Sequence, residues 1–82
     1  MSFKAVRVTW LDSAIIEEWT PVAELPQTRF KKIETLGWLI RKTKEMLVVA
    51  AHVGKQPDQV SGAMFIPMGS VILIEDLDVK AI

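Results

Sequence analysis

Five short segments of alternating or continuously apolar residues, separated by Gly, Pro, Asp and Ser, predict an all-β fold. The segments follow one another closely, except for one irregular stretch after the first, and no repeat or linker divides the 82 residues. We therefore expect a single domain over residues 1–82, built as a small, strongly bent, five-stranded β-barrel. Closure into a barrel is favoured because the free edges of an open sheet invite aggregation.

The first strand is predicted over Lys4 to Trp10, where side chains alternate between two faces. Val6, Val8 and Trp10 share one face, which is expected to be buried. Asp12-Ser13 is a turn or capping signal that ends the strand.

Residues 14–27 show no strand periodicity. Thr20-Pro21 has the pattern of a helix cap followed by proline at the first helical position, which predicts one short helical turn through Leu25. Two placements are open for the apolar side chains of this segment, Ile15, Ile16 and Trp19. They either fold back as a lid over an open end of the barrel or stay exposed and meet a neighbouring subunit.

The longest strand is predicted over Phe30 to Lys42, and Gly37 within it indicates a sharp bend or a bulge. Thr43-Lys44 is the next turn. Met46 to Val53 is apolar on both faces, which is typical of a central strand or an interface strand. Gly54 to Gln59 reads as a loop from its Gly, Pro and Asp residues.

The last two strands are predicted over Val60 to Pro67 and Val71 to Leu77. The tight turn Met68-Gly69-Ser70 joins them, and we expect this corner to close the barrel.

The composition excludes several kinds of site but does not identify a function. Half of the residues are hydrophobic, the formal net charge is zero, and there are no cysteines and one histidine. These counts exclude disulfides, thiolate metal sites and a multi-histidine site, and they predict no cofactor. Because the chain is small and so rich in apolar residues, we expect it to form a homo-oligomer that covers its exposed apolar surface. We expect no membrane span and a cytoplasmic location, because no apolar run approaches the length of a span and the N-terminus lacks a signal-peptide core.

The pattern VRVTWLDSA, then EW, TLGWLI, MLVVAA and FIPMGSVILI resembles the small SH3-like or Sm-like barrels encoded by bacteriophages and prophages. The residues that carry the resemblance extend over most of the chain and are Trp10, Asp12, Trp19, Gly37, Trp38, Ile66, Pro67 and Ile72. The resemblance implies a non-enzymatic protein that assembles with its own copies, in the manner of Sm-like rings, in the cytoplasm of an infected or lysogenic bacterium.

Some Sm-like rings bind single-stranded RNA, but the residues of that pocket are not matched here. Gly37 and Met46 fall at Gly and Met positions of the first Sm motif, whereas Thr43 and Leu47 stand at its Asp and Asn positions. Pro67-Met68 stands where the second motif has Arg-Gly, and the chain has no tyrosine for the Tyr-Lys-His motif of the bacterial branch. The resemblance therefore adds little to an RNA-binding hypothesis.

Two sets of residues are candidates for contacts with partners. Basic side chains that could face phosphates are Lys31, Arg41, Lys42, Lys44, His52 and Lys55, with solvated strand ends and pairing between subunits as the plainer interpretation. Residues that could line an interface between subunits are Trp19, Val60, Met64, Ile66, Val71 and Leu73.

The acidic residues predict neither catalysis nor a metal site. Asp12, Glu17, Glu18 and Glu24 lack the arrangement that glycoside hydrolysis or cation binding requires, and a solvated loop explains them. His52 could act as a general base, but no nucleophile motif accompanies it in the sequence. We expect a binding or assembly module, with a nucleic-acid-binding ring and a phage structural component or inhibitor of a host protein as the alternatives.

Overall fold

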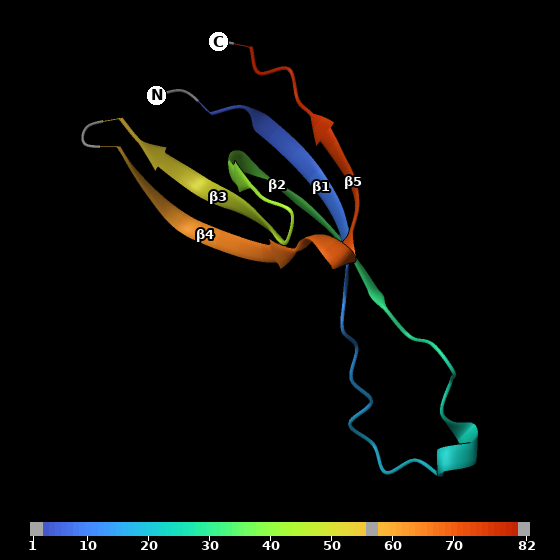
Figure 1. The fold of residues 1–82 in the computed structure, drawn as a ribbon. Coiled ribbons are helices and arrows are strands. Elements are labelled where there is room, and N and C mark those ends of the chain that lie inside the picture. The colour runs from blue at the N-terminus through green and yellow to red at the C-terminus, as the bar shows by residue number, and fades with distance from the viewer. Residues whose placement is uncertain (1–2, 56–57, 81–82) are drawn as a thin grey trace.

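A computed structural model describes residues 3–55 and 58–80. It contains one five-stranded antiparallel sheet with strand order β4-β3-β2-β1-β5 and two short 3-10 helices (Figure 1). The elements in chain order are β1 (Ala5–Asp12), η1 (Val22–Glu24), β2 (Lys31–Lys42), β3 (Met46–Gly54), β4 (Gln59–Pro67), η2 (Met68–Ser70) and β5 (Val71–Asp76). The all-β prediction and the five strands are confirmed. The loop predicted over residues 54–59 lies partly outside the described residues.

β1 has the alternation that the sequence predicts. Val6 and Val8 are fully buried, and Trp10 packs against the same core cluster. The indole Nε1 of Trp10 donates a hydrogen bond of 3.0 Å to Oγ1 of Thr35 on the neighbouring strand. This bond satisfies the polar atom of a side chain that is otherwise apolar and half-buried.

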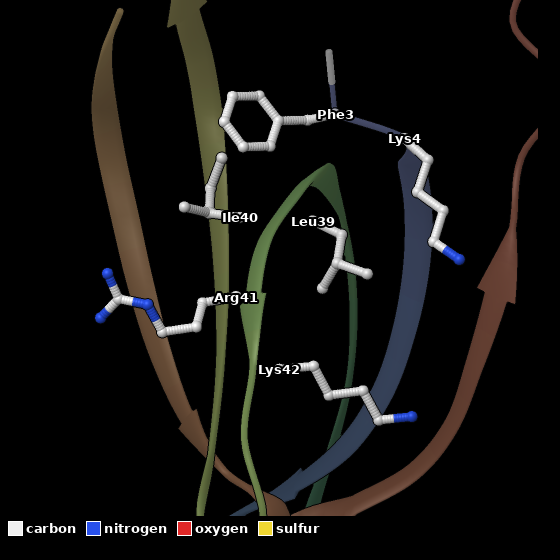
Figure 2. Close-up of a pocket in the computed structure, with 6 residues that line it drawn as sticks. All are labelled: Phe3, Lys4, Leu39, Ile40, Arg41 and Lys42. Atoms are coloured by element: carbon white, nitrogen blue, oxygen red, sulfur yellow. The ribbon is translucent and has the colours of Figure 1, made fainter. Parts of the chain in front are cut away.

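β2 is strongly bent, and its two halves pair with different neighbours. The half that begins at Lys31 pairs with β1 as far as Trp38, whereas the half from Trp38 to Lys42 pairs with β3. The strand folds over near Leu39 between these two halves (Figure 2). The register with β3 shifts between Leu39 and Arg41, which marks a bulge at this point.

The bulge changes which side chains of β2 face inward. Arg41 pairs with Val48 and so lies on the outer face, whereas regular alternation would place it on the inner face with Leu39. Trp38 is also on the outer face, where it is half-buried opposite Ala50 and is not part of the core cluster. The inner face carries Thr35 and Gly37 instead, opposite Val8 and Val6.

Gly37 lies where β2 and β3 come closest, and the bend itself falls a few residues later. A Cβ atom at Gly37 would be 2.6 Å from Cγ1 of Val49 and 2.8 Å from the carbonyl oxygen of Ala50. Only glycine fits this approach without a shift of the neighbouring strand. The glycine predicted to mark a bulge therefore serves the packing of the two halves.

β3 is the central strand of its half of the sheet, as its apolar sequence predicts. Its residues Leu47 to Ala50 are all buried. One face of the strand packs on the core, and side chains on the outer face of the sheet cover the other. Leu47 and Val49 form the core cluster with Val6, Val8 and Ile66.

The sheet is not closed into a barrel, which corrects the expected closure at the Met68-Gly69-Ser70 corner. β4 pairs with β3 and β5 pairs with β1, so these two strands are the outer edges of the sheet. The corner forms the 3-10 helix η2, and the N–H of Met68 donates to the carbonyl oxygen of Glu45. η2 thus fixes one end of the two half-sheets to each other, while β4 and β5 diverge from it (Figure 1).

Residues 13–30, here called the arm, extend away from the sheet between β1 and β2 (Figure 1). The predicted helical turn is present as η1, but Thr20 does not cap it; its hydroxyl donates to the carbonyl oxygen of Glu18. The radius of gyration is 16.6 Å, against about 12 Å for a compact domain of this length. The projecting arm accounts for the difference.

The close approach at Gly37 gives a first prediction. Gly37→Ala is expected to destabilise the fold by about 1–3 kcal/mol, because the new methyl group overlaps Val49 and the Ala50 backbone. The matched control is Gly69→Ala, where nothing lies within 4 Å of the added Cβ and the change should stay within about 0.5 kcal/mol. Urea denaturation followed by far-UV circular dichroism measures both. Equal stability of the two variants would contradict the packing role of Gly37.

Candidate interaction surfaces

The predicted basic residues do not form one patch. Lys31 lies opposite Asp12 where the arm leaves the sheet, whereas Arg41 and Lys42 lie in the other half of β2. Lys44 is in the turn before β3 and Lys55 follows its end, so a strand of about 26 Å separates these two. A single phosphate-binding surface from all the candidates is therefore not formed.

His52 is exposed near the end of β3, and the ladder places it opposite Ser61 of β4. A Ser–His pair would need a hydrogen bond from hydroxyl to imidazole to act in nucleophilic catalysis. Among the hydrogen bonds between described residues, none joins His52 to Ser61. The pair lies on an open strand surface and carries no catalytic assignment.

The acidic residues after β1 are dispersed along the arm. Asp12 accepts a hydrogen bond of 2.8 Å from the backbone N–H of Ser13, as expected of a turn residue. Glu17, Glu18 and Glu24 are exposed. In residues 3–55 and 58–80, no group of three potential ligands lies close enough to hold a metal ion.

A hollow of about 460 Å³ is the feature that the sequence did not indicate. We call it the basic hollow, and its lining residues are Phe3, Lys4, Leu39, Ile40, Arg41 and Lys42. Figure 2 shows Leu39 between Lys4 and Lys42, with all three side chains directed to one side of β2. Phe3, Ile40 and Arg41 point to the other side.

Backbone pairing explains why these residues meet. The N–H of Leu39 donates a hydrogen bond of 2.8 Å to the carbonyl oxygen of Lys4, just before β1 begins. Beyond the bend, β2 pairs with β3, and Arg41 and Lys42 of this half line the hollow together with Phe3 and Lys4. Lys4 and Lys42 thus flank Leu39 on one side of β2 (Figure 2), and this combination of positive charge and apolar surface suits an anionic group that carries an apolar side chain.

The arm exposes its apolar side chains almost completely. Trp19 is as accessible as in an unfolded chain, with a relative exposure of 104%, and Ile15 is exposed at 76%. The predicted lid is therefore wrong for these two residues, and Ile16 is half-buried. Burying a side chain of this size is worth about 1.5–3 kcal/mol, so an uncovered arm forgoes a substantial stabilisation.

The edges of the sheet are also apolar. Val60 and Met64 on β4 and Leu73 on β5 are each 40–50% exposed. Ile66 is fully buried and Val71 packs against the core, so these two stabilise the fold and do not present side chains to a neighbour. Phe65, which the sequence did not single out, is 61% exposed on β4.

An ion pair ties the edge strand β5 to β1. Arg7 donates two hydrogen bonds to the carboxylate of Glu75, of 3.0 Å from Nε and 2.9 Å from Nη2. These hydrogen bonds lower the pKa of Glu75 below its usual range, with the charge of Arg7 acting in the same direction. A bidentate pair of this geometry is better ordered than a single contact between exposed charges.

The lowered pKa of Glu75 predicts a pH dependence of stability. A carboxylate whose folded pKa lies below its unfolded pKa stabilises the fold above the unfolded value and loses that contribution as pH falls through the folded one. Glu75→Gln should therefore lower the melting temperature at pH 7, and the difference should shrink to nothing as pH falls below about 4.

The matched control for Glu75→Gln is Asp76→Asn, which removes an exposed pair with Lys4 at 3.5 Å and should have a smaller effect. Differential scanning calorimetry between pH 7 and pH 3 measures both variants. A difference for Glu75→Gln that stays constant over this range would contradict the role of the ionised carboxylate.

No helix in the described part of the chain is both long and apolar enough to cross a membrane. A scan against protein-family models and searches of curated proteins and of solved structures gave no match to this chain.

Proposed function

We propose that this protein is a non-enzymatic binding or assembly module that associates with its own copies through the edges of its sheet, in a ring of Sm-like subunits. The observation that carries the proposal is the pair of open edges, β4 and β5, in one small sheet. An edge strand has free main-chain donors and acceptors, and a second edge strand satisfies them by continuing the sheet. One copy's β4 and the next copy's β5 supply two different edges, so the contact can repeat from copy to copy.

The exposed side chains support the same proposal. Among the described residues, thirteen large apolar side chains are exposed, against seven apolar residues in the core. Apolar surface on this scale usually marks contact with another molecule. Met64 and Leu73 lie on the two edges and would be covered when the edges pair.

The Sm-like part of the proposal draws on the bent strand and on the sequence pattern. The halves of β2 belong to two half-sheets, and a short 3-10 turn joins the last two strands, as suits a strongly bent Sm-like sheet. The sequence markers of phage-encoded barrels, such as Gly37 and Pro67, lie at the contact between the halves and at this corner. On this resemblance we propose a bacteriophage or prophage module that acts in the cytoplasm of the bacterial host, either in phage structures or on a host protein.

Association through the edges predicts a specific effect of charge. Leu73→Lys, on the edge strand β5, should weaken self-association tenfold or more, which corresponds to about 1.4 kcal/mol, because a lysine must lose its hydration at the contact. The matched control is Leu36→Lys on the inner strand β2, where the leucine is also exposed and association should be unchanged.

Light scattering after size exclusion, over a range of concentrations, measures the mass of each variant, and circular dichroism checks that each is folded. A monomeric unmodified protein at micromolar concentration would refute the proposal. Equal weakening by Leu73→Lys and Leu36→Lys would show that the edges are not the contact.

A further inference from the structure

The arm carries one short segment in which charge and apolar surface are combined. Ile16-Glu17-Glu18-Trp19 places two carboxylates between two apolar side chains. Trp19 is fully exposed, and both glutamates are exposed beside it. A complementary surface would contact the indole with apolar side chains and the carboxylates with positive charges.

The basic hollow has the complementary composition. Leu39 lies between Lys4 and Lys42, and Ile40 adds apolar surface beside Arg41 (Figure 2). An indole placed on the apolar part would have cations within reach of its face, an arrangement that is itself attractive. Its neighbouring carboxylates would then meet ammonium or guanidinium groups at the rim.

Within one copy, most charges of the two surfaces have no ion-pair partner among the residues that the structure describes. Among the described residues, no ion pair includes Glu17, Glu18, Arg41 or Lys42. Lys4 has only a loose contact of 3.5 Å with Asp76. The arm and the basic hollow therefore offer opposite charges that the fold itself leaves uncompensated.

The arm of one copy leaves the sheet in the direction away from the apolar part of its own basic hollow (Figure 1). The apolar part of the hollow lies level with Lys4, eight residues or about 26 Å along β1 from Asp12, where the arm begins. Trp19 follows Asp12 by seven residues, which span at most about 25 Å when fully extended. No residues remain for the reversal of the chain, and the arm in fact extends in the opposite direction (Figure 1).

We propose that Glu17-Glu18-Trp19 of one copy docks into the basic hollow of a second copy. Trp19 covers the apolar surface at Leu39, and the two glutamates pair with Lys4 and Lys42, which flank this leucine on the same side of β2 (Figure 2). This contact rests on the proposed self-association, because it needs a second copy of the chain. It does not require that the edge strands pair. The arm would then act as a tether between subunits.

Zero-length crosslinking with a carbodiimide tests this contact, because the reagent joins a carboxylate to an amine that it touches. Equal amounts of ¹⁴N- and ¹⁵N-labelled protein are mixed, equilibrated and crosslinked. We expect peptides that join Glu17 or Glu18 to Lys42 or Lys4 and that combine both isotopes. The Lys4–Asp76 crosslink within a single copy, expected from their contact, is the internal control and should carry one isotope.

Charge reversal provides the second test. Glu17→Lys with Glu18→Lys, and separately Lys4→Glu with Lys42→Glu, should each weaken association at least tenfold in sedimentation experiments. Combining all four changes should restore most of the loss, because the reversed charges again attract. Glu24→Lys, an exposed change in the same arm but outside the docking segment, is the matched control and should have no effect.

Three results would overturn the proposal. The first is the absence of mixed-isotope crosslinks between arm and hollow while the Lys4–Asp76 crosslink forms. The second is a variant with all four charge reversals that associates as weakly as the variants with only two of them. The third is loss of binding to a fluorescent single-stranded RNA on reversal of Lys4 and Lys42, with association unaffected by any arm variant, which would assign the hollow to nucleic acid.

Failure of edge pairing would show separately, as equal behaviour of Leu73→Lys and Leu36→Lys.

Discussion

The fold depends on one strand that belongs to two half-sheets. β2 pairs with β1 as far as Trp38 and with β3 from Trp38 onward, so the core lies between the two half-sheets that β2 joins. Such a strand must bend sharply, and the added residue between Leu39 and Arg41 supplies the bend. The two halves of β2 must also bring β1 and β3 close enough together to exclude water. Gly37 permits this because it has no side chain where Val49 approaches. Without both features, Val6 and Val8 would have no opposing layer, and a flat five-stranded sheet would expose one of its two apolar faces.

The elements of this fold were predictable because their signals are local, whereas closure and the candidate surfaces depend on contacts between distant residues. Alternation at Val6 and Val8 and the continuous apolar run of β3 correctly indicated a half-buried and a central strand. Regular alternation would place Arg41 on the inner face with Leu39, because a sequence pattern cannot show where a strand gains a residue. Whether β4 meets β5 depends on the twist accumulated over five strands, and no short pattern encodes it. The basic hollow was missed for a similar reason, since Lys4 and Lys42 lie far apart in sequence and meet through backbone pairing and the bend.

The distribution of apolar side chains gives the molecule two levels of organisation. A small inner set holds the two half-sheets together, and a larger outer set lies on the edge strands and on the arm. A single copy of this length has too little interior to bury both sets, since small domains bury a smaller fraction of their surface than large ones. The proposed pairing of edges and the proposed docking of the arm would cover different parts of the outer set, so the two contacts are compatible within one assembly.

The position of the arm has a consequence for how proteins of this type can diversify. Asp12 and Lys31 face each other as the last pair of the β1–β2 ladder, so the two ends of the arm are held about 5 Å apart by the sheet itself. The arm adds no side chain to the core, and the entropic cost of closing a loop grows only slowly with its length. Replacement or lengthening of the arm therefore leaves the requirements of folding satisfied. Selection can change what this molecule binds by altering a single insertion while the sheet beneath it stays the same.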